Sequence, residues 1–187
     1  MKRLFIALEF IPDNDFLTFH AQVCSVFTAL DKVNLVRPDL IHITLNFLGN
    51  TEDHKVKPVI QGMQAAVKDI SPFILIIGKP GVFGSRDRPR VLWLGVSNTE
   101  PLQQLHEQLQ IEIKKIGFKP DHENFVPHLT LARINKIDSK RSFWNKIELL
   151  TQDFVQQIYV DKIVLYESIL RGHAPIYQKI EEVPLSI

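Results

Sequence analysis

Two short stretches of the sequence carry side chains that could do acid–base chemistry. They repeat one motif, H-x-T-L, at His42-Ile43-Thr44-Leu45 and at His128-Leu129-Thr130-Leu131. Composition alone would produce roughly 0.03 such motifs in a chain of this make-up, so chance does not account for two copies. Successive side chains of a strand point to opposite faces. Each motif would therefore place its His and Thr on one face and its aliphatic residues on the other.

Two imidazoles that face each other across a cleft can share a reaction. Because the ordinary pKa of His is about 6.5, one ring can accept a proton from water while the other donates a proton to a leaving group. Each Thr hydroxyl lies about 6 to 7 Å along the strand from its His and can donate to a nonbridging phosphoryl oxygen. This set of groups suits in-line attack on a phosphodiester with an alkoxide leaving group.

Metal binding is the competing chemistry for a pair of histidines. A catalytic zinc or dimetal site needs a third ligand, usually His or a carboxylate, and neither motif strand offers one on the same face. The remaining histidines lack metal-binding spacing, and they are His20, His54, His106, His122 and His173. The P-loop, GxGxxG and GxSxG motifs are also absent. We therefore expect neither a metal nor a cofactor.

The overall charge restricts how the protein could meet a nucleic acid. A formal net charge of +1 excludes strong nonspecific polyanion binding as the main activity, so any contact with nucleic acid would be local. The stretch 78–90 is rich in Gly, Pro and Arg and predicts a hairpin with a long basic loop. Arg86, Arg88 and Arg90 fit either a solvated loop or a positive lip that meets a phosphate chain.

Cysteine content and the first residues bear on the compartment. Cys24 is the only cysteine, so no intrachain disulfide can form, and we expect a reducing cytoplasm and a buried, inert thiol. The apolar run before Glu9 is too short for a signal peptide or a membrane span. We expect a cytoplasmic monomer without membrane contact.

Hydrophobic periodicity predicts an α+β fold in a single bilobed domain over residues 1–187. Two rough copies of a strand–helix–strand unit would form two antiparallel sheets related by a pseudo-twofold axis, facing a central cleft with helices outside. The predicted strands cover about 2–9, 34–36, 41–48, 73–77, 91–96, 128–134, 154–170 and 176–183. The predicted helices cover about 13–30, 52–70, 100–116 and 139–150.

Strict alternation along the first motif strand assigns its faces. Ile41, Ile43, Leu45 and Phe47 would be buried, while His42, Thr44 and Asn46 would share the polar face. Phe10, Phe47 and Phe83 are candidates for stacking on a nucleobase, although core packing is the commoner use of phenylalanine.

Several surrounding stretches carry a family resemblance. They are Arg3-Leu-Phe-Ile-Ala, Val36-Arg-Pro, Phe47-Leu-Gly, Arg90-Val-Leu-Trp and Val126-Pro-His-Leu-Thr-Leu-Ala-Arg133. In these stretches and in the paired motifs, the sequence resembles the 2H phosphoesterases. It is most similar to their RNA 2′,3′-cyclic phosphodiesterase branch, historically called 2′-5′ RNA ligase, over nearly the whole chain.

This resemblance implies metal-free hydrolysis of an RNA 2′,3′-cyclic phosphate to a 2′-phosphate end. His42 would protonate the departing O3′, His128 would activate water, and Thr44 and Thr130 would hold the phosphate. The pseudosymmetry leaves the roles of the two histidines interchangeable from sequence. Arg133 matches the arginine that follows the second motif of the family. Simple alternation puts Arg133 on the face opposite His128, so reaching the phosphate would require a bulge or the end of the strand.

Other functions remain open from the sequence. Leu35 stands where this branch often has Trp, which leaves the substrate preference open. A small cyclic nucleotide, an ADP-ribose cyclic phosphate or a 2′-5′-linked oligonucleotide could be the substrate, and reverse ligation could accompany hydrolysis. The cleft could instead belong to a noncatalytic module that binds RNA ends or nucleotides, or the protein could be a scaffold.

Overall fold

The computed structural model describes residues 1–119, 125–150, 154–171 and 174–186. These residues form nine strands, four α-helices and a short 3-10 helix. In chain order they are β1 (Lys2–Glu9), α1 (Asn14–Val26), β2 (Lys32–Leu35), η1 (Pro38–Leu40), β3 (His42–Thr51), α2 (Asp53–Ala66), β4 (Phe73–Gly84), β5 (Pro89–Ser97), α3 (Glu100–Lys115), β6 (His128–Lys136), α4 (Lys140–Leu150), β7 (Val155–Val160), β8 (Lys162–Arg171) and β9 (Ala174–Pro184).

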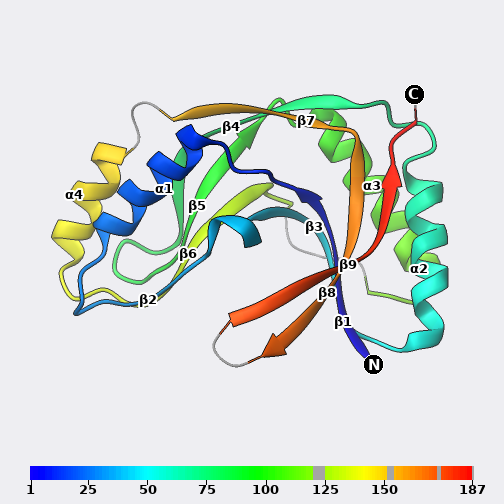
Figure 1. The fold of residues 1–187 in the computed structure, drawn as a ribbon, viewed down its shortest axis with the longest axis horizontal. Helices are drawn as coiled ribbons and strands as arrows, with labels where there is room; N and C mark the ends of the chain where they lie inside the picture. Colours follow the sequence, from blue (N-terminus) through cyan, green and yellow to red (C-terminus); the bar gives the residue numbers. More distant parts are fainter. Residues whose placement is uncertain (120–124, 151–153, 172–173, 187) are drawn as a thin grey trace.

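The strands form a curled antiparallel sheet that brings the two motif strands to its centre (Figure 1). Its order is β7-β4-β5-β6-β3-β1-β8-β9, and β2 pairs with the far end of β6. The predicted α+β class is confirmed, with antiparallel halves and helices outside. The two predicted sheets are joined into one, because Ile43 of β3 pairs with Leu129 of β6.

The helices and one face of the sheet enclose the main core. The α1 and α4 pair covers one half and the α2 and α3 pair covers the other (Figure 1). Every helix contributes fully or largely buried side chains to this core, among them Phe16, Met63, Leu105 and Phe143. The opposite face of the sheet, here called the inner face, carries a smaller apolar cluster of Phe5, Ala7, Val164, Tyr166 and Tyr177.

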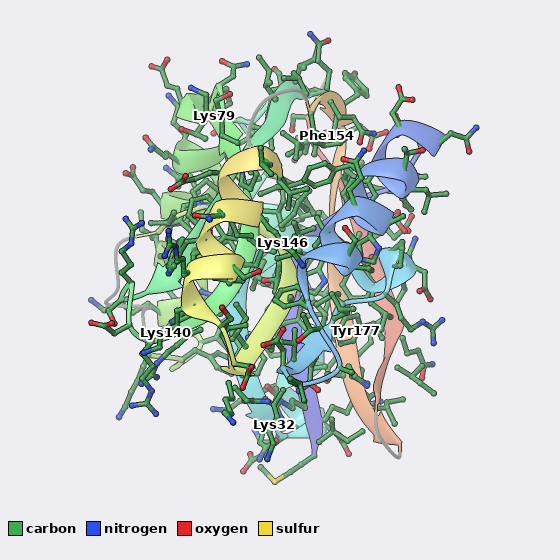
Figure 2. All side chains as sticks on the ribbon, turned by 90° about the vertical axis from the view of Figure 1, so that its left-hand side faces the viewer. Lys32, Lys79, Lys140, Lys146, Phe154 and Tyr177 are labelled. Carbon is green, nitrogen blue, oxygen red and sulfur yellow. The ribbon has the colours of Figure 1, made fainter. Side chains whose placement is uncertain are left out.

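Local contacts explain the position of α1. The Asp13 side chain caps the helix by accepting a hydrogen bond of 2.7 Å from the backbone N–H of Phe16. The helix ends at Val26, earlier than predicted, because the next residue adopts an extended conformation. Lys146 of α4 donates to the carbonyls of Ser25 and Val26 at 3.2 and 3.1 Å, which fastens α4 to the end of α1 (Figure 2).

Two strand predictions need correction. The strand expected at 73–77 continues to Gly84, and β5 begins at Pro89, so the long basic loop is a hairpin with a short tip at Ser85–Arg88. A shift in register between Gly78 and Pro80 accommodates the proline, which cannot donate to the ladder. The continuous strand expected at 154–170 is divided into β7, which pairs with β4, and β8, which pairs with β1.

Two further observations concern Cys24 and membrane spans. Cys24 is partly buried rather than fully buried, and desolvation raises the pKa of its thiol. None of the helices within the described ranges has the length and apolar character needed to span a membrane.

Candidate active site

The pairing of β3 with β6 brings the two motifs side by side. Ile43 and Leu129 are register partners, and both side chains are fully buried in the main core. Their polar neighbours therefore lie on the inner face. The next positions of the same antiparallel register set His42 opposite Thr130 and Thr44 opposite His128. The two histidines thus occupy one diagonal of a four-residue arrangement and the two threonines the other.

A β-bulge follows each motif threonine. In the β1–β3 ladder Ile6 pairs with Asn46 and Ala7 pairs with Thr44, so Leu45 is left without a partner. In the β5–β6 ladder Leu92 pairs with Ala132 and Trp93 pairs with Thr130, so Leu131 is left without a partner. An extra residue in one strand reverses the alternation of faces beyond it. The leucine of each H-x-T-L motif is this extra residue.

The bulge after Thr44 overturns two assignments made from alternation. Asn46, expected on the polar face, is 4% exposed, whereas Phe47, expected in the core, is 53% exposed. The bulge after Thr130 has the corresponding effect on Arg133. Its side chain lines the same cleft as Thr130 and His42, although unbroken alternation would turn it away.

A cleft of about 450 Å³ opens on the inner face at this point. Four of the five predicted site residues line it, namely His42, Thr44, Thr130 and Arg133. His128 stands beside this cavity rather than in its lining, across the strand pair from Thr44. The structure therefore brings all five side chains to one region, with Arg133 and Phe47 reaching it through the bulges.

The two imidazoles are held in the same way. His42 Nδ1 lies 2.8 Å from the carbonyl oxygen of Leu40, and His128 Nδ1 lies 2.7 Å from the carbonyl oxygen of Val126. Since a carbonyl oxygen can only accept, Nδ1 carries the hydrogen in both rings. Each neutral ring therefore keeps Nε2 as a proton acceptor.

Aromatic rings support both histidines. The Phe5 and Tyr177 ring centroids lie 4.9 and 5.3 Å from that of His42. Those of Phe83 and Trp93 lie 4.9 and 6.2 Å from that of His128. Phe83, one of the stacking candidates, thus packs against a motif histidine.

The other aromatic contacts separate core residues from cleft residues. Phe10 lies in the core and is 4% exposed, and its ring centroid is 4.6 Å from that of Phe16. It is therefore not available to a ligand. The Arg3 guanidinium lies 5.1 Å from the ring centroid of Phe47, and both residues line the cleft.

Burial lowers the pKa of both motif histidines. For His42 desolvation is the main cause, and the charges of Arg133 and His128 lower the pKa further. The hydrogen bond to the Leu40 carbonyl raises the pKa and offsets part of this shift. For His128 desolvation is again the main cause, and the charge of Arg133 also lowers the pKa. The hydrogen bond to the Val126 carbonyl acts in the opposite direction and raises the pKa. Both rings are therefore mainly neutral at neutral pH.

Sequence reasoning missed several residues that line the cleft, among them Arg3, Phe5 and Tyr177. The alternation of β1 does place Phe5 opposite Leu4 and Ile6, which is a signal for the inner face. Tyr177 has no such signal, because it reaches the cleft only through the pairing of β9 with β8. Within the described ranges, no group of three or more His, Cys, Asp or Glu side chains could hold a metal ion.

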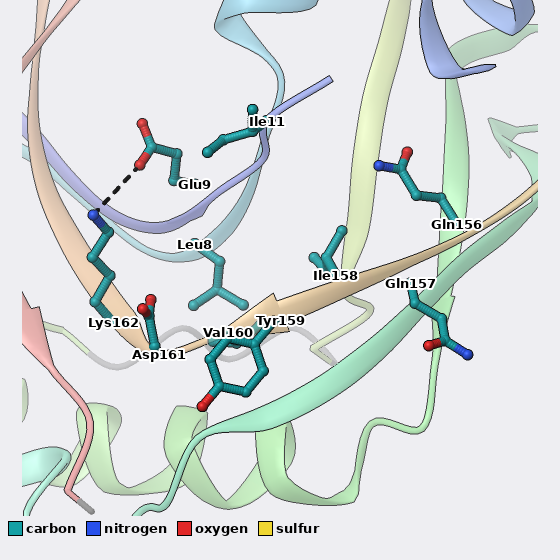
Figure 3. A pocket seen from close by; sticks show the side chains of 10 residues that line it. All are labelled: Leu8, Glu9, Ile11, Gln156, Gln157, Ile158, Tyr159, Val160, Asp161 and Lys162. Carbon is teal, nitrogen blue, oxygen red and sulfur yellow. Dashed lines mark ion pairs between the residues drawn. The ribbon is translucent and has the colours of Figure 1, made fainter. Parts of the chain in front are cut away.

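A second cavity lies away from the motifs. It has a volume of about 240 Å³ and lies between the end of β1 and the stretch 156–162 (Figure 3). Glu9 and Lys162 form an ion pair of 3.8 Å at one side. None of the five predicted site residues lines this cavity.

Comparison with known proteins adds independent findings. A family model described as the 2′-5′ RNA ligase superfamily matches residues 34–169. The RNA 2′,3′-cyclic phosphodiesterase of Methanocaldococcus jannaschii is 30% identical over 183 residues, covering 96% of this chain and 99% of that protein. The protein of the same name from Aquifex aeolicus is 36% identical over 149 residues, 79% of each chain.

Solved structures show the same fold. The protein TT0787 of Thermus thermophilus superposes with a TM-score of 0.76 at 22% identity, covering 98% of this chain and 97% of that one. LigT of E. coli, solved with 3′-AMP, also gives a TM-score of 0.76 at 22% identity, with coverage of 100% and 99%.

Proposed function

Since this chain belongs to the 2′-5′ RNA ligase superfamily, we propose that it hydrolyses RNA 2′,3′-cyclic phosphate termini to 2′-phosphomonoester ends. Relatives named RNA 2′,3′-cyclic phosphodiesterase at 30–36% identity support this activity. The observation that carries the proposal is the diagonal arrangement of His42, Thr130, Thr44 and His128 around the Ile43–Leu129 pair.

This arrangement suits an in-line displacement. Diagonal positions on neighbouring strands are about 7 to 8 Å apart, so a phosphorus atom between them has an imidazole on each side. One imidazole can act on the attacking water and the other on the leaving oxygen. The hydroxyls of Thr44 and Thr130 occupy the crossing diagonal, where they can donate to the nonbridging oxygens.

In the proposed reaction His128 Nε2 accepts a proton from water as the water oxygen bonds to phosphorus. The bond from phosphorus to O3′ breaks, and protonated His42 donates its proton from Nε2 to O3′. Arg133 and the two threonines stabilise the negative charge on the nonbridging oxygens. The bound phosphate anion also raises the pKa of His42, which favours the protonated form that the acid step needs. The product carries a 2′-phosphate and a free 3′-hydroxyl.

The same geometry would accept an RNA 5′-hydroxyl in place of water. The hydroxyl oxygen would then bond to phosphorus, and the product would contain a 2′-5′ phosphodiester. We include this reaction as a minor activity, because water at about 55 M competes with a dilute 5′-hydroxyl.

The first experiment uses purified protein, EDTA and an oligoribonucleotide that ends in a 2′,3′-cyclic phosphate. We expect a 2′-phosphate product, and we expect turnover to fall at least about a thousandfold in His42→Ala and in His128→Ala. A 3′-phosphate product, or full activity in either variant, would contradict the proposal. Tight binding of the 2′-phosphorylated product with no turnover by the native protein would instead identify a noncatalytic RNA-end module.

We also propose that the protein acts as a cytoplasmic monomer without a metal. The single cysteine supports a reducing compartment, and the paired imidazoles need no Lewis acid. We expect the protein to retain its activity after EDTA treatment. In size-exclusion chromatography we expect it to elute at the volume of a 21.6 kDa particle.

A further inference from the structure

Exposed cations continue from the cleft along the outer end of β6. Arg133 lines the cleft, and Lys136 lies three residues further along the same strand, about 10 Å away. Lys32 of β2 is the register partner of Lys136, and both side chains are exposed. The positive charge of the phosphate site therefore extends onto the surface beside it.

The tip of the β4–β5 hairpin adds to this surface. Val91 of β5 pairs with Arg133, so Arg90 and the tip at Ser85–Arg88 lie beside the same end of β6. The tip is closed by hydrogen bonds between the backbones of Ser85 and Arg88 at 3.2 and 3.0 Å. Its shape is thus fixed by local hydrogen bonds.

Helix α4 holds the hairpin tip in place. Trp144 Nε1 donates to the carbonyl oxygen of Arg86 at 3.0 Å, and the Arg86 guanidinium lies 5.7 Å from the Trp144 ring centroid. Lys140 at the start of α4 forms an ion pair of 3.8 Å with Asp87 of the tip. Figure 2 shows Lys140 and Lys32 on the same face of the molecule.

The exposed cations of these neighbouring elements are here called the basic tract: Lys32, Arg86, Arg88, Arg90, Lys136, Lys140 and Arg141. The acidic residues among them are Asp31, Asp87 and Asp138. The tract therefore has a formal charge of +4 in a chain of net charge +1. By contrast, α2 and α3 on the far side carry four Lys and four acidic residues, so their formal charges cancel.

We propose that the basic tract binds the sugar-phosphate chain upstream of the terminal cyclic phosphate, an inference that rests on the proposed function. For an RNA terminus seated at Thr130 and Arg133, exposed cations continue along β6 toward Lys136 and the hairpin tip. Phosphate contacts of this kind are sequence-independent and release bound counterions. A mononucleotide has no upstream phosphates and cannot use the tract.

The test compares substrates that differ only in chain length. The triple variant Arg88→Gln, Arg90→Gln, Lys136→Gln changes exposed side chains outside the cleft. The matched control Lys57→Gln, Lys68→Gln, Lys114→Gln removes the same charge from exposed positions of the α2 and α3 side. Steady-state kinetics would use a ten-nucleotide RNA with a 2′,3′-cyclic phosphate end and a mononucleoside 2′,3′-cyclic phosphate.

We expect the tract variant to raise KM for the RNA about tenfold or more at low salt and to leave the mononucleotide kinetics within about twofold. Loss of three contacts should also reduce the slope of log affinity against log salt by about 2. The control variant should behave like the native protein. Equal effects of the tract variant on both substrates, or an equal effect of the control, would overturn the proposal.

The outcome for the proposed function can be separated from the outcome for the tract. If the native protein turns over neither substrate, the proposed function fails. Binding of the same ten-nucleotide RNA with a 2′-phosphate end, measured against salt for the native and tract-variant proteins, then decides whether the tract binds RNA. An affinity and a salt slope unchanged in the variant would reject it.

Discussion

Phe47 and Arg133 occupy equivalent positions in the two halves of the molecule. Each lies two residues beyond the bulged leucine of its motif strand, and each reaches the cleft because of that bulge. The groups between them repeat, since both halves supply a His and a Thr. The cleft therefore has two similar sides, each with a His and a Thr, but different ends, one with Phe47 and Arg3 and the other with Arg133. We expect this difference to orient a bound nucleotide.

Phe47 is predicted to stack on the terminal nucleobase. Its ring is half exposed, and Arg3 lies 5.1 Å from its centroid. Stacking of a base on an aromatic ring contributes about 1 to 3 kcal/mol. Phe47→Leu should therefore raise KM for a mononucleoside cyclic phosphate about 5- to 150-fold with little change in kcat, and Phe47→Tyr should keep the native KM. Steady-state kinetics would measure both.

An abasic cyclic phosphate provides the control for Phe47. Its KM should be the same for the native protein and for Phe47→Leu, because it has no base to stack. If Phe47→Leu weakened the abasic substrate equally, the ring would be shaping the cleft rather than stacking on a base.

The pH dependence of kcat/KM should follow from the lowered pKa values of the two histidines. Burial is the main cause for both, and kcat/KM reports the free enzyme. The base becomes protonated on the acidic limb and the acid loses its proton on the basic limb. Because both pKa values lie below the ordinary value, the maximum should fall on the acidic side of about 6.5. A kcat/KM maximum above pH 7 would contradict this prediction.

Removing the charge of Arg133 should move that profile. The Arg133 guanidinium lowers the pKa of both His42 and His128, so Arg133→Met should raise both pKa values and shift both limbs to higher pH. The rate should also fall by about 10- to 150-fold, because a charged hydrogen bond to phosphate contributes about 1.5 to 3 kcal/mol. Arg133→Lys, which keeps the charge, should leave the limbs near their native positions. Unchanged limbs in Arg133→Met would show that the Arg133 charge does not contribute to the two pKa values.

The sequence was sufficient to find the motif residues but not all of the cleft. The repeated H-x-T-L pattern identifies His42, Thr44, His128 and Thr130, because residues two apart in a strand lie on the same face. Phe47 was assigned to the wrong face, because a bulge inserts one residue without leaving a trace in the alternation. Whether a strand contains an extra residue depends on its pairing with the neighbouring strand. Here β1 pairs with β3, and the paired residues lie about 40 positions apart in the sequence.

Long-range pairing also explains the remaining errors in the fold. Gly78 and Pro80 read as a loop by composition, yet β4 continues through them because β5 supplies a partner along its length. The stretch 154–170 is rich in strand-forming residues, and its polar pair Asp161-Lys162 marks the break between β7 and β8 without showing that they pair with different strands. Local pattern predicts that a strand exists. Its length and its partners depend on the neighbours available in the folded sheet.

Gly81 is predicted to set the position of Trp93 beside His128. The two residues are register partners, and a Cβ added at Gly81 would lie 2.3 Å from the Trp93 ring. Gly81→Ala should therefore displace the ring and destabilise the protein by about 1 to 3 kcal/mol, the usual cost of overpacking. Because Trp93 and Phe83 both contact His128, the limb of the pH profile that belongs to His128 should shift as well. Urea unfolding and kcat/KM against pH would measure these effects.

Trp93→Phe supplies the matched rescue for Gly81→Ala. The buried Trp93 Nε1 has no hydrogen-bond partner in the part of the chain that the structure describes, so replacing Trp93 by Phe removes an unpaired donor and should cost little by itself. In the Gly81→Ala background the smaller ring leaves room for the new methyl group, and most of the lost stability should return. The two changes should therefore be coupled by about 1 kcal/mol or more. Strictly additive free energies of unfolding would show that Gly81 and the Trp93 ring do not constrain each other.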